Sequence, residues 1–421
     1  MNDMGPKQER AVLCGLAADC FAPEENSGDV SMDELAALVE TAGGAVVATV
    51  LQRRAAPDPR SFIGAGKVQE LKELLDKNGG DLAVFDNELS PSQMRVLSEE
   101  LGVKVLDRSG LILDIFAQRA RTREGRLQVE LAQYRYLLPR LLGMWTHLER
   151  QEGAIGTRGP GETQLESDRR HIRRKIQKLE QELSEVRRTR AVQRRRREKN
   201  EVPVVALVGY TNAGKSTLLN RLTGSDIPAN DRLFDTLDTT TRRLMVDEVQ
   251  EVLLSDTVGF IRRLPTHLIE AFKATLEELA FADVLLHVID LSSPEWETQA
   301  QVVDALVTQL GAEGTPCIRV YNKCDVAAVP LPRETDAVCV SARTGEGLDA
   351  LLRGVSAALG RGKRRAVFLL PFAQGALVQR LHDEAAVLSL DYTESGVRTE
   401  AVVKPDLWAA LRPYAVEERA L

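Results

Sequence analysis

A glycine-rich segment in the middle of the sequence has the residue types and spacing needed to bind phosphate. An apolar run starting at Val202 leads into Gly209, Gly214, Lys215 and Ser216, which follow the pattern G-x-x-x-x-G-K-S and open a predicted helix. In such a P-loop, backbone N–H groups converge on phosphate oxygens, the lysine reaches the β- and γ-phosphates, and the serine hydroxyl binds Mg²⁺. The segment therefore predicts a site for a nucleoside triphosphate and Mg²⁺.

Two further segments could complete this site. The apolar strand that ends in VLLSDTVG places Asp256 at a strand end, where its carboxylate can hold the Mg²⁺ shell, and Gly259 can donate its N–H to a γ-phosphate. Between the P-loop and Asp256, the stretch 233–243 has threonines that could close over the metal and the γ-phosphate. The residue types do not choose among these threonines, which are Thr236, Thr239, Thr240 and Thr241.

The base is predicted from residues that follow two later strands. Asn322 and Asp325 follow an apolar strand, and the carboxylate of Asp325 can accept hydrogen bonds from both N1–H and the 2-amino group of guanine. Adenine has an acceptor at N1 and no 2-amino group. After the next strand, a backbone N–H of Ser341 or Ala342 is placed to favour guanine O6. The order of the four segments, each after an apolar strand, is the one that a GTP-hydrolysing enzyme needs.

Residues 1–123 are predicted to form a small parallel-sheet α/β domain, because short β runs alternate with stretches of helical spacing. The stretch FIGAGK at 62–67 is not a second P-loop, since Ser61 stands where glycine is required and Val68 where serine or threonine is required. We expect a turn followed by a helix there, with contact to a nucleotide as the alternative. The strands are expected at 11–18, 45–51, 81–86 and 103–106, and the helices at 32–42, 64–77 and 90–101, with Ser31 and Ser90 as N-caps.

Residues 124–200 are predicted to form an antiparallel helical hairpin. Apolar residues recur at spacings of three, four and seven in two successive stripes, and two such helices would bury their stripes against each other. One stripe consists of Leu127, Leu131, Tyr134, Leu138, Leu141, Trp145 and Leu148, and the other of Leu165, Ile172, Ile176, Leu179, Leu183 and Val186.

The hairpin also has an unusual tip and an unusual charge. The joining stretch 153–164 contains four glycines and one proline, so it is either a flexible connection or a probe pressed against another backbone. Residues 165–198 carry a net charge of +7, whereas the whole chain carries −7. This asymmetry indicates a surface for a polyanion, or a solvated helix face, and together with the tip it favours the probe. The run Arg194–Arg197 ends the hairpin.

The composition is that of a globular chain with several domains. At about 150 residues per domain, 421 residues predict two to four domains, and the chain is 43% hydrophobic and 28% charged. We assign 201–362 to a P-loop GTPase domain and 363–421 to a small α/β C-terminal domain. The five cysteines form no C-x-x-C pair, which favours a reducing cytoplasm. No run approaches the roughly 18 apolar residues of a membrane span. We expect the protein to be cytoplasmic, and we expect a monomer.

The motifs together resemble a known family. GYTNAGKS, FDTLD, DTVGFIRRLP, NKCD and SARTGEGL, preceded by GTRGPGETQLESDRR, are similar to the HflX family of translational GTPases over residues 45–360. The resemblance implies that Thr236 is the Mg²⁺-binding threonine beside Ser216, with Asp256 holding the metal's water shell. It also implies binding of GTP and GDP, and of the large ribosomal subunit and its RNA. The expected role is splitting or rescue of stalled ribosomes under stress.

The resemblance extends the nucleotide site to neighbouring positions of each motif. The residues expected to contact nucleotide are Gly209, Tyr210, Thr211, Asn212, Ala213, Gly214, Lys215, Ser216, Thr217, Phe234, Asp235, Thr236, Leu237, Asp238, Asp256, Thr257, Val258, Gly259, Asn322, Lys323, Cys324, Asp325, Ser341, Ala342 and Arg343.

The catalytic residues are not identified by the motifs. Lys215, Thr236 and Gly259 are candidates, but many GTPases have a water-orienting glutamine immediately after D-x-x-G, and this chain has Phe260 there. Hydrolysis by the free protein is therefore expected to be slow and to be stimulated by the ribosome. Asn212 resembles the asparagine that binds a monovalent cation in related GTPases, which makes K⁺ a second candidate cofactor. Its alternative role is a hydrogen bond that stabilises the loop.

Two other functions are compatible with these residues. The first is an adaptor or assembly factor that binds RNA or the ribosome through the hairpin, with GTP only setting its conformation. The second is an RNA-modifying GTPase, which is disfavoured because no C-x-x-C, Cys–His pair or methyl-donor motif stands outside 202–360. Turnover measured with and without ribosomes separates the leading hypothesis from the adaptor, since an adaptor is not accelerated.

Overall fold

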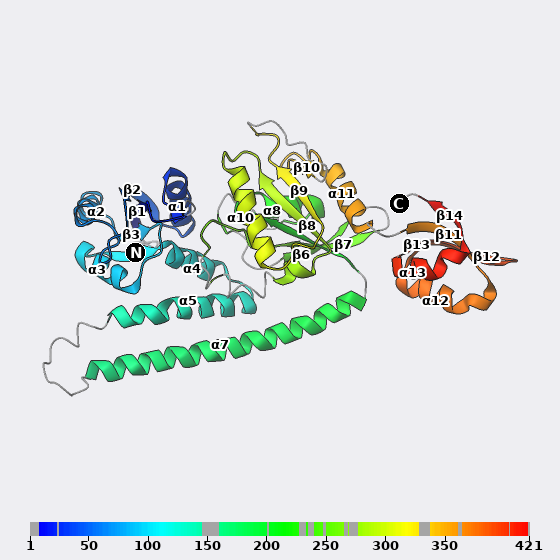
Figure 1. Cartoon of the computed structure of the whole chain (residues 1–421), viewed down its shortest axis with the longest axis horizontal. Helices are drawn as coiled ribbons and strands as arrows, with labels where there is room; N and C mark the ends of the chain where they lie inside the picture. The colour runs from blue at the N-terminus through cyan, green and yellow to red at the C-terminus, as the bar shows by residue number, and fades with distance from the viewer. Residues whose placement is uncertain are drawn as a thin grey trace, which may run out of the picture.

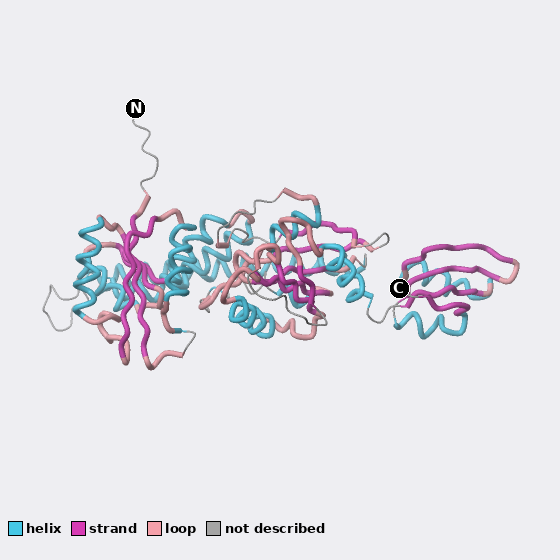
Figure 2. Tube along the Cα trace, turned by 90° about the horizontal axis from the view of Figure 1, so that it is seen from above, coloured by secondary structure: helices cyan, strands magenta, loops and turns pink. Residues whose placement is uncertain are grey.

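In the computed structural model, three sheets follow one another along the molecule, and two long helices run beside the first two sheets (Figure 1). The same row of sheets is seen from above in Figure 2. This multidomain α/β architecture confirms the predicted fold class. The structure describes residues 8–22, 25–144, 160–199, 202–226, 233–234, 240–246, 250–264, 268, 277–327, 337–360, 364–403 and 405–419.

The N-terminal sheet is parallel, with the strand order β2-β1-β3-β4. Side chains alternate between its faces, so that Leu13 and Val84 pack with α1 and α4, whereas Cys14 and Phe85 pack with α2 and α3. The strands are β1 (Arg10–Ala18), β2 (Ala45–Arg54), β3 (Leu82–Phe85) and β4 (Lys104–Asp107), and the helices are α1 (Asp29–Thr41), α2 (Ala65–Asn78), α3 (Pro91–Leu101) and α4 (Arg108–Arg119).

Local signals in this region were mostly predicted correctly. Ser90 is the N-cap of α3 and its hydroxyl accepts a hydrogen bond from the Gln93 N–H. The prediction for Ser31 is wrong, because α1 begins three residues earlier and its N-cap is Gly28, whose N–H donates to the Ser31 hydroxyl. The FIGAGK stretch forms the predicted turn and helix, with Gly64 as the N-cap of α2.

The hairpin consists of α5 (Arg123–Met144) and α7 (Pro160–Lys199). Their apolar stripes meet as predicted: Leu127 and Leu131 form one cluster with Leu179 and Leu183. Ion pairs flank the seam, including Lys175 with Glu130 and Arg135 with Glu180. The predicted joining stretch 153–164 lies outside the described residues as far as 159, and residues 160–164 belong to α7, so the second helix begins earlier than predicted. Nothing is described of the side chains of Leu141, Trp145, Leu148 and Leu165.

The central sheet has six strands in the order β10-β9-β8-β5-β7-β6, and only β6 is antiparallel to its neighbour. Its five parallel strands end at one common edge, which is where the predicted motifs follow them. The elements are β5 (Val204–Gly209), α8 (Lys215–Thr223), β6 (Thr240–Met245), β7 (Glu251–Asp256), η2 (Glu277–Phe281), β8 (Val284–Asp290), α10 (Trp296–Gln309), β9 (Cys317–Asn322), β10 (Ala337–Cys339) and α11 (Leu348–Gly360).

The C-terminal sheet is antiparallel, in the order β12-β13-β11-β14, and two helices bury their apolar residues against one face of it. Within the described residues, no helix is both long and apolar enough to cross a membrane. The elements are β11 (Arg364–Leu370), η3 (Phe372–Gln374), α12 (Gly375–Glu384), β12 (Ala386–Thr393), β13 (Gly396–Val403), α13 (Pro405–Leu411), η4 (Arg412–Tyr414) and β14 (Ala415–Arg419).

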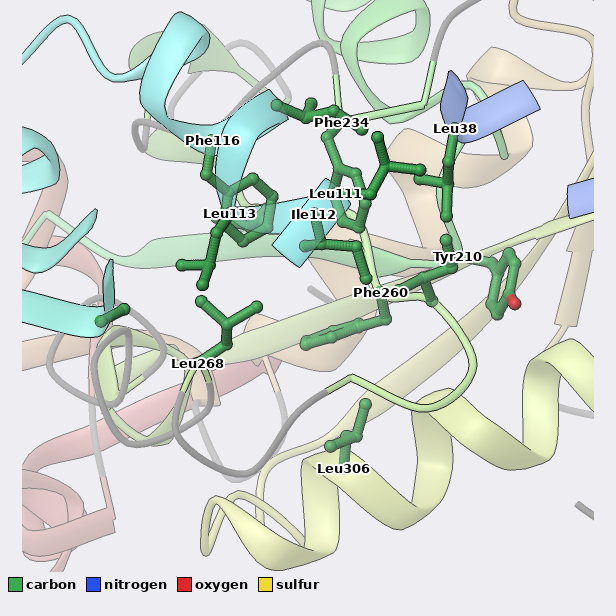
Figure 3. Close-up of a cluster of buried hydrophobic side chains, with 14 of the residues drawn as sticks. Leu38, Leu111, Ile112, Leu113, Phe116, Tyr210, Phe234, Phe260, Leu268 and Leu306 are labelled. Atoms are coloured by element: carbon green, nitrogen blue, oxygen red, sulfur yellow. The ribbon is translucent and has the colours of Figure 1, made fainter. Parts of the chain in front are cut away.

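One hydrophobic cluster crosses from the N-terminal sheet to the central sheet. It contains Leu35 of α1 and Phe116 of α4 together with Tyr210, Phe234 and Phe260 from loops of the central sheet. Figure 3 shows side chains of α4 and of these loops gathered in one group. The rings of Phe116 and Phe234 meet edge to face, with centroids 4.7 Å apart. The two sheets therefore share part of their core.

Candidate nucleotide site

The P-loop connects β5 to α8 and holds a buried lysine. The ammonium of Lys215 donates hydrogen bonds to the carbonyls of Gly209, at 3.0 Å, and Tyr210, at 2.8 Å. Burial lowers the pKa of Lys215 to about 8, and the nearby Asp256 carboxylate opposes this shift. A cation fixed at the amino end of a helix is suited to bind an anion such as a phosphate.

Gly214 is needed because the loop passes close to another segment. Its φ is +93°, which is unfavourable for residues with a side chain, and a Cβ there would lie 2.3 Å from Nδ2 of Asn322. The space is used by Asn322 itself, whose Nδ2 donates to the Ala213 carbonyl at 2.8 Å and whose Oδ1 accepts from the Ala342 N–H at 3.0 Å. Asn322 thus connects its own motif, NKCD, to the P-loop and to the SARTGEGL motif.

The residues predicted to hold Mg²⁺ lie at the carboxyl ends of β5 and β7. The Ser216 hydroxyl donates to Oδ2 of Asp256 at 2.6 Å. A hydroxyl and a carboxylate are the hard oxygen donors that Mg²⁺ prefers, so this pair fits a magnesium site. Of the four threonines, Thr240 and Thr241 belong to strand β6, whereas Thr236 and Thr239 lie outside the described residues.

Segment 256–264 lies directly on the P-loop. The Phe260 N–H donates to the Gly209 carbonyl at 3.1 Å, and the Phe260 carbonyl accepts from the Thr211 N–H at 2.7 Å. These bonds bring Gly259 beside Lys215, since a Cβ on Gly259 would lie 3.2 Å from the Lys215 ammonium. The Phe260 ring is 1% exposed and belongs to the cluster shared with the N-terminal sheet, so its side chain serves packing.

The predicted base-reading residues lie together beyond β9 and β10. Asp325 forms an ion pair with Arg343, and hydrogen bonds from Ser341 and Arg343 lower the pKa of Asp325. Lys323 has a φ of +61° and its ammonium lies 2.7 Å from Oδ2 of Asp290. Asp325 is therefore ionised at neutral pH, as acceptance of two guanine N–H groups requires.

Two acidic residues of the N-terminal region, for which the motifs predict no role, contact the P-loop and segment 256–264. Glu34 accepts a hydrogen bond from the Tyr210 hydroxyl, and Asp86 pairs with Arg263. The sequence gives no signal for Glu34 or Asp86, which lie in a region without a motif. Only their partners, Tyr210 and Arg263, belong to motifs. The predicted Asp235, Thr236, Leu237 and Asp238 lie outside the described residues.

Comparison with known proteins gives matches along nearly the whole chain. Three family descriptions match in succession: GTP-binding GTPase N-terminal at 29–117, GTP-binding GTPase middle region at 119–197 and 50S ribosome-binding GTPase at 204–323. The GTPase HflX of Caldanaerobacter subterraneus subsp. tengcongensis is 44% identical over 416 residues, which are 99% of this chain and 96% of that protein. The GTPase HflX of Escherichia coli is 45% identical over 92% of this chain and 91% of its own length.

The chain belongs to the GTPase HflX family. A third relative, the GTPase HflX of Alkalihalophilus pseudofirmus, is 50% identical over 83% of both chains. As a member of this family the chain binds GTP and GDP and hydrolyses GTP. A solved GTP-binding protein from Sulfolobus solfataricus, in complex with GDP, is similar over 84% of this chain and 99% of that chain, with 24% identity and a TM-score of 0.44.

Proposed function

We propose that this GTPase binds the large ribosomal subunit and its RNA and acts in splitting or rescuing stalled ribosomes. The observation that carries the proposal is the match of 204–323 to a family described as 50S ribosome-binding GTPase. The charge of the hairpin supports it, because a basic helix next to a GTPase domain is suited to contact RNA phosphates. The predicted limits of the four domains, at 123, 200 and 362, belong to the same proposal.

The proposed roles at the centre follow its geometry. Lys215 binds the β- and γ-phosphates, Ser216 and Thr236 bind Mg²⁺ with Asp256 on its water shell, and Gly259 donates to the γ-phosphate. The Mg²⁺ supplies charge that stabilises the transferring phosphoryl group. Asn212 is the proposed K⁺ ligand, which is tested by comparing turnover in KCl and in NaCl for wild type and Asn212→Ala. Asp325 is the proposed acceptor for the N–H groups of guanine, and a backbone N–H of Ser341 or Ala342 is the proposed donor to its O6.

The hairpin is the proposed RNA contact, and salt dependence tests it. Arg170, Arg173, Arg174 and Lys178 are exposed along α7. Replacing these four by Gln should reduce the slope of log K against log salt by about 3 in a pelleting assay with purified large subunits, since each phosphate contact contributes roughly 0.7 to 0.9.

A matched variant separates this effect from a general change of charge. Arg60, Lys72, Lys77 and Lys104 are exposed in the N-terminal region, and their replacement by Gln removes the same charge. The slope should then stay at its wild-type value. An unchanged slope for the α7 variant would show that this helix is only a solvated face.

Turnover distinguishes the proposal from the adaptor hypothesis. Because Phe260 has no polar group that could orient water, the free protein should hydrolyse GTP slowly, and docking on the large subunit should complete the arrangement. GTP turnover is measured alone and with large subunits, and subunit separation is followed by sedimentation. A rate that large subunits leave unchanged would favour the adaptor, in which GTP is a conformational ligand.

A further inference from the structure

The strand order of the N-terminal sheet has a switch point, the place where a crevice binds ligands in other α/β proteins. In the order β2-β1-β3-β4, the chain leaves β1 on one side towards β2 and later returns on the other side to β3. In open parallel sheets, ligands bind at such a switch point, outside the carboxyl ends of the two diverging strands. Here those ends are Ala18 of β1 and Phe85 of β3, and Asp86 follows immediately.

The crevice holds a side chain from the central part of the chain. Arg263 lies there with one guanidinium nitrogen 2.7 Å from Oδ2 of Asp86 and another donating to the Asn26 carbonyl. Asp86 has no exposed side-chain surface and also accepts hydrogen bonds from the hydroxyls of Ser27 and Ser31. This carboxylate is therefore built into the N-terminal sheet as an acceptor, and a guanidinium from another domain is one of its donors.

A second acidic residue extends the contact to the P-loop. Glu34 accepts from the Tyr210 hydroxyl, and the same hydroxyl accepts from the Arg262 N–H at 2.8 Å. Arg108 is 3% exposed and links the two acids, because it forms ion pairs with both Glu34 and Asp86. The N-terminal region thus holds Tyr210 and Arg263 through one connected network of largely buried charges on α1, α4 and the residue after β3.

The network ends close to the phosphate site. Arg263 has a φ of +52°, which a residue with a side chain adopts only where its surroundings hold it. Three residues before it, the backbone of Phe260 is bonded to both sides of Tyr210, and Gly259 lies beside Lys215. Fixing Arg263 and Tyr210 therefore fixes the Gly259 N–H relative to the P-loop lysine.

We propose that this crevice is the receptor site for the Arg263 guanidinium, and that Asp86 and Glu34 are positioning residues for the γ-phosphate site. Gly259 can donate to a γ-phosphate, which GDP lacks, so the contact raises affinity for GTP and leaves affinity for GDP unchanged. This inference rests on the γ-phosphate role proposed above for Gly259; it concerns the free protein and does not depend on ribosome binding.

The adjacent arginine provides a matched control. Arg262 pairs with Glu295 at 2.8 Å, and both lie in the central part of the chain. Arg263→Gln and Arg262→Gln remove the same charge from neighbouring positions, but only the first cuts the contact with the N-terminal sheet. Affinities for GDP and for a non-hydrolysable GTP analogue are measured by fluorescence titration of the full chain with Mg²⁺.

The expected result is a change in the ratio of the two affinities. Arg263→Gln and Asp86→Asn should each weaken the GTP analogue by about tenfold, within the usual range of coupling between sites, and change GDP by less than twofold. The double variant should lose no more than the larger single effect, because both changes cut one contact. Arg262→Gln should keep the wild-type ratio.

Three results would overturn the proposal. Equal losses for GDP and the GTP analogue would mean that the contact only stabilises the fold, and thermal unfolding of each variant measures that contribution directly. Unchanged affinities would mean that the crevice does not act on the phosphate site. Tighter binding of the GTP analogue would mean that the contact restrains Gly259 and does not present it.

Discussion

The two faces of the central sheet are buried in different ways. On the face covered by α8 and α11, every buried residue of the cluster comes from between Val205 and Leu359. On the other face, Tyr210 and Phe260 share a cluster with Leu35 and Phe116 of the N-terminal region. The first core belongs to the central sheet alone, whereas the second joins two sheets.

The difference separates two tasks of the site. The first core includes Ala213 and Ala342, next to Asn322, so the parts proposed to bind any guanine nucleotide rest on the central sheet itself. The segments proposed to contact the γ-phosphate rest on the core shared with the N-terminal sheet. With the roles proposed above, binding a guanine nucleotide and distinguishing GTP from GDP would have separate structural supports.

The largest effect is expected in the part of the site that rests on the core of the central sheet alone. Lys215→Ala should weaken GTP and GDP together by at least about hundredfold, roughly 3 kcal/mol, because it removes a charged donor to phosphate from a buried position. Isothermal titration with both nucleotides measures this. A loss confined to GTP would break the comparison, since Lys215 would then act only with the γ-phosphate segments.

A smaller effect of a different kind is expected at the base. Asp325→Asn should weaken GTP by about thirtyfold, roughly 2 kcal/mol, and should strengthen binding of xanthosine triphosphate, whose C2 carbonyl can accept from the new amide. Competition between the two nucleotides measures the change of preference. If Asp325→Asn kept wild-type preference for GTP, the guanine assignment would have to be abandoned.

A pair of matched core variants sharpens the comparison directly. Phe116 and Phe85 are both fully buried in the N-terminal region, but in different clusters. Phe116 belongs to the cluster shared with the central sheet, and Phe85 belongs to the cluster with α2 and α3. Each change to Leu should cost about 1.5 kcal/mol of stability. Only Phe116→Leu should also lower affinity for a GTP analogue, because Phe116 packs on Phe234. Equal nucleotide binding by both variants would contradict a separate role for the shared core.

The smallest effect is a pH dependence. Because the pKa of Lys215 is about 8, its ammonium is mostly charged at pH 7 and mostly neutral at pH 9. The charged form binds phosphate, so affinity for GDP should fall as pH rises through 8 and be about tenfold weaker, or 1.4 kcal/mol, at pH 9 than at pH 7. Lys215→Ala is the control, since ionisation of guanine affects both proteins equally. If the affinity for GDP fell with pH equally in wild type and Lys215→Ala, Lys215 would not be the group that titrates.

Local patterns predicted most of the fold. The strands of the N-terminal sheet, the seam of Leu127 and Leu131 against Leu179 and Leu183, and the P-loop before α8 all follow from periodicity and motif spacing. These features depend on residues close together in the sequence or on a repeated stripe. Ser31 misleads as an N-cap of α1 because it is a cap-type residue that stands at the third helical position, where its hydroxyl accepts from the Gly28 N–H.

The contact between sheets could not be predicted in this way. In the sequence, Phe260 draws attention because it has no polar group that could orient water. In the structure its apolar ring packs in the cluster shared by the two sheets. Nothing in the spacing of Glu34 or Asp86 indicates a partner far along the chain. Such pairing depends on the tertiary arrangement, which a periodic pattern does not encode.

The contact of Asp86 with Arg263 also orders events during synthesis of the chain. The last strand of the N-terminal sheet ends at residue 107, and Arg263, the partner of Asp86, follows 156 positions later. At about 5 to 20 residues per second, translation takes roughly 8 to 30 seconds to cover that distance. A sheet that folds before Arg263 is made already has Arg108 to pair with Glu34 and Asp86, but Oδ2 of Asp86 and the Asn26 carbonyl have not yet met the arginine that they accept from in the finished protein.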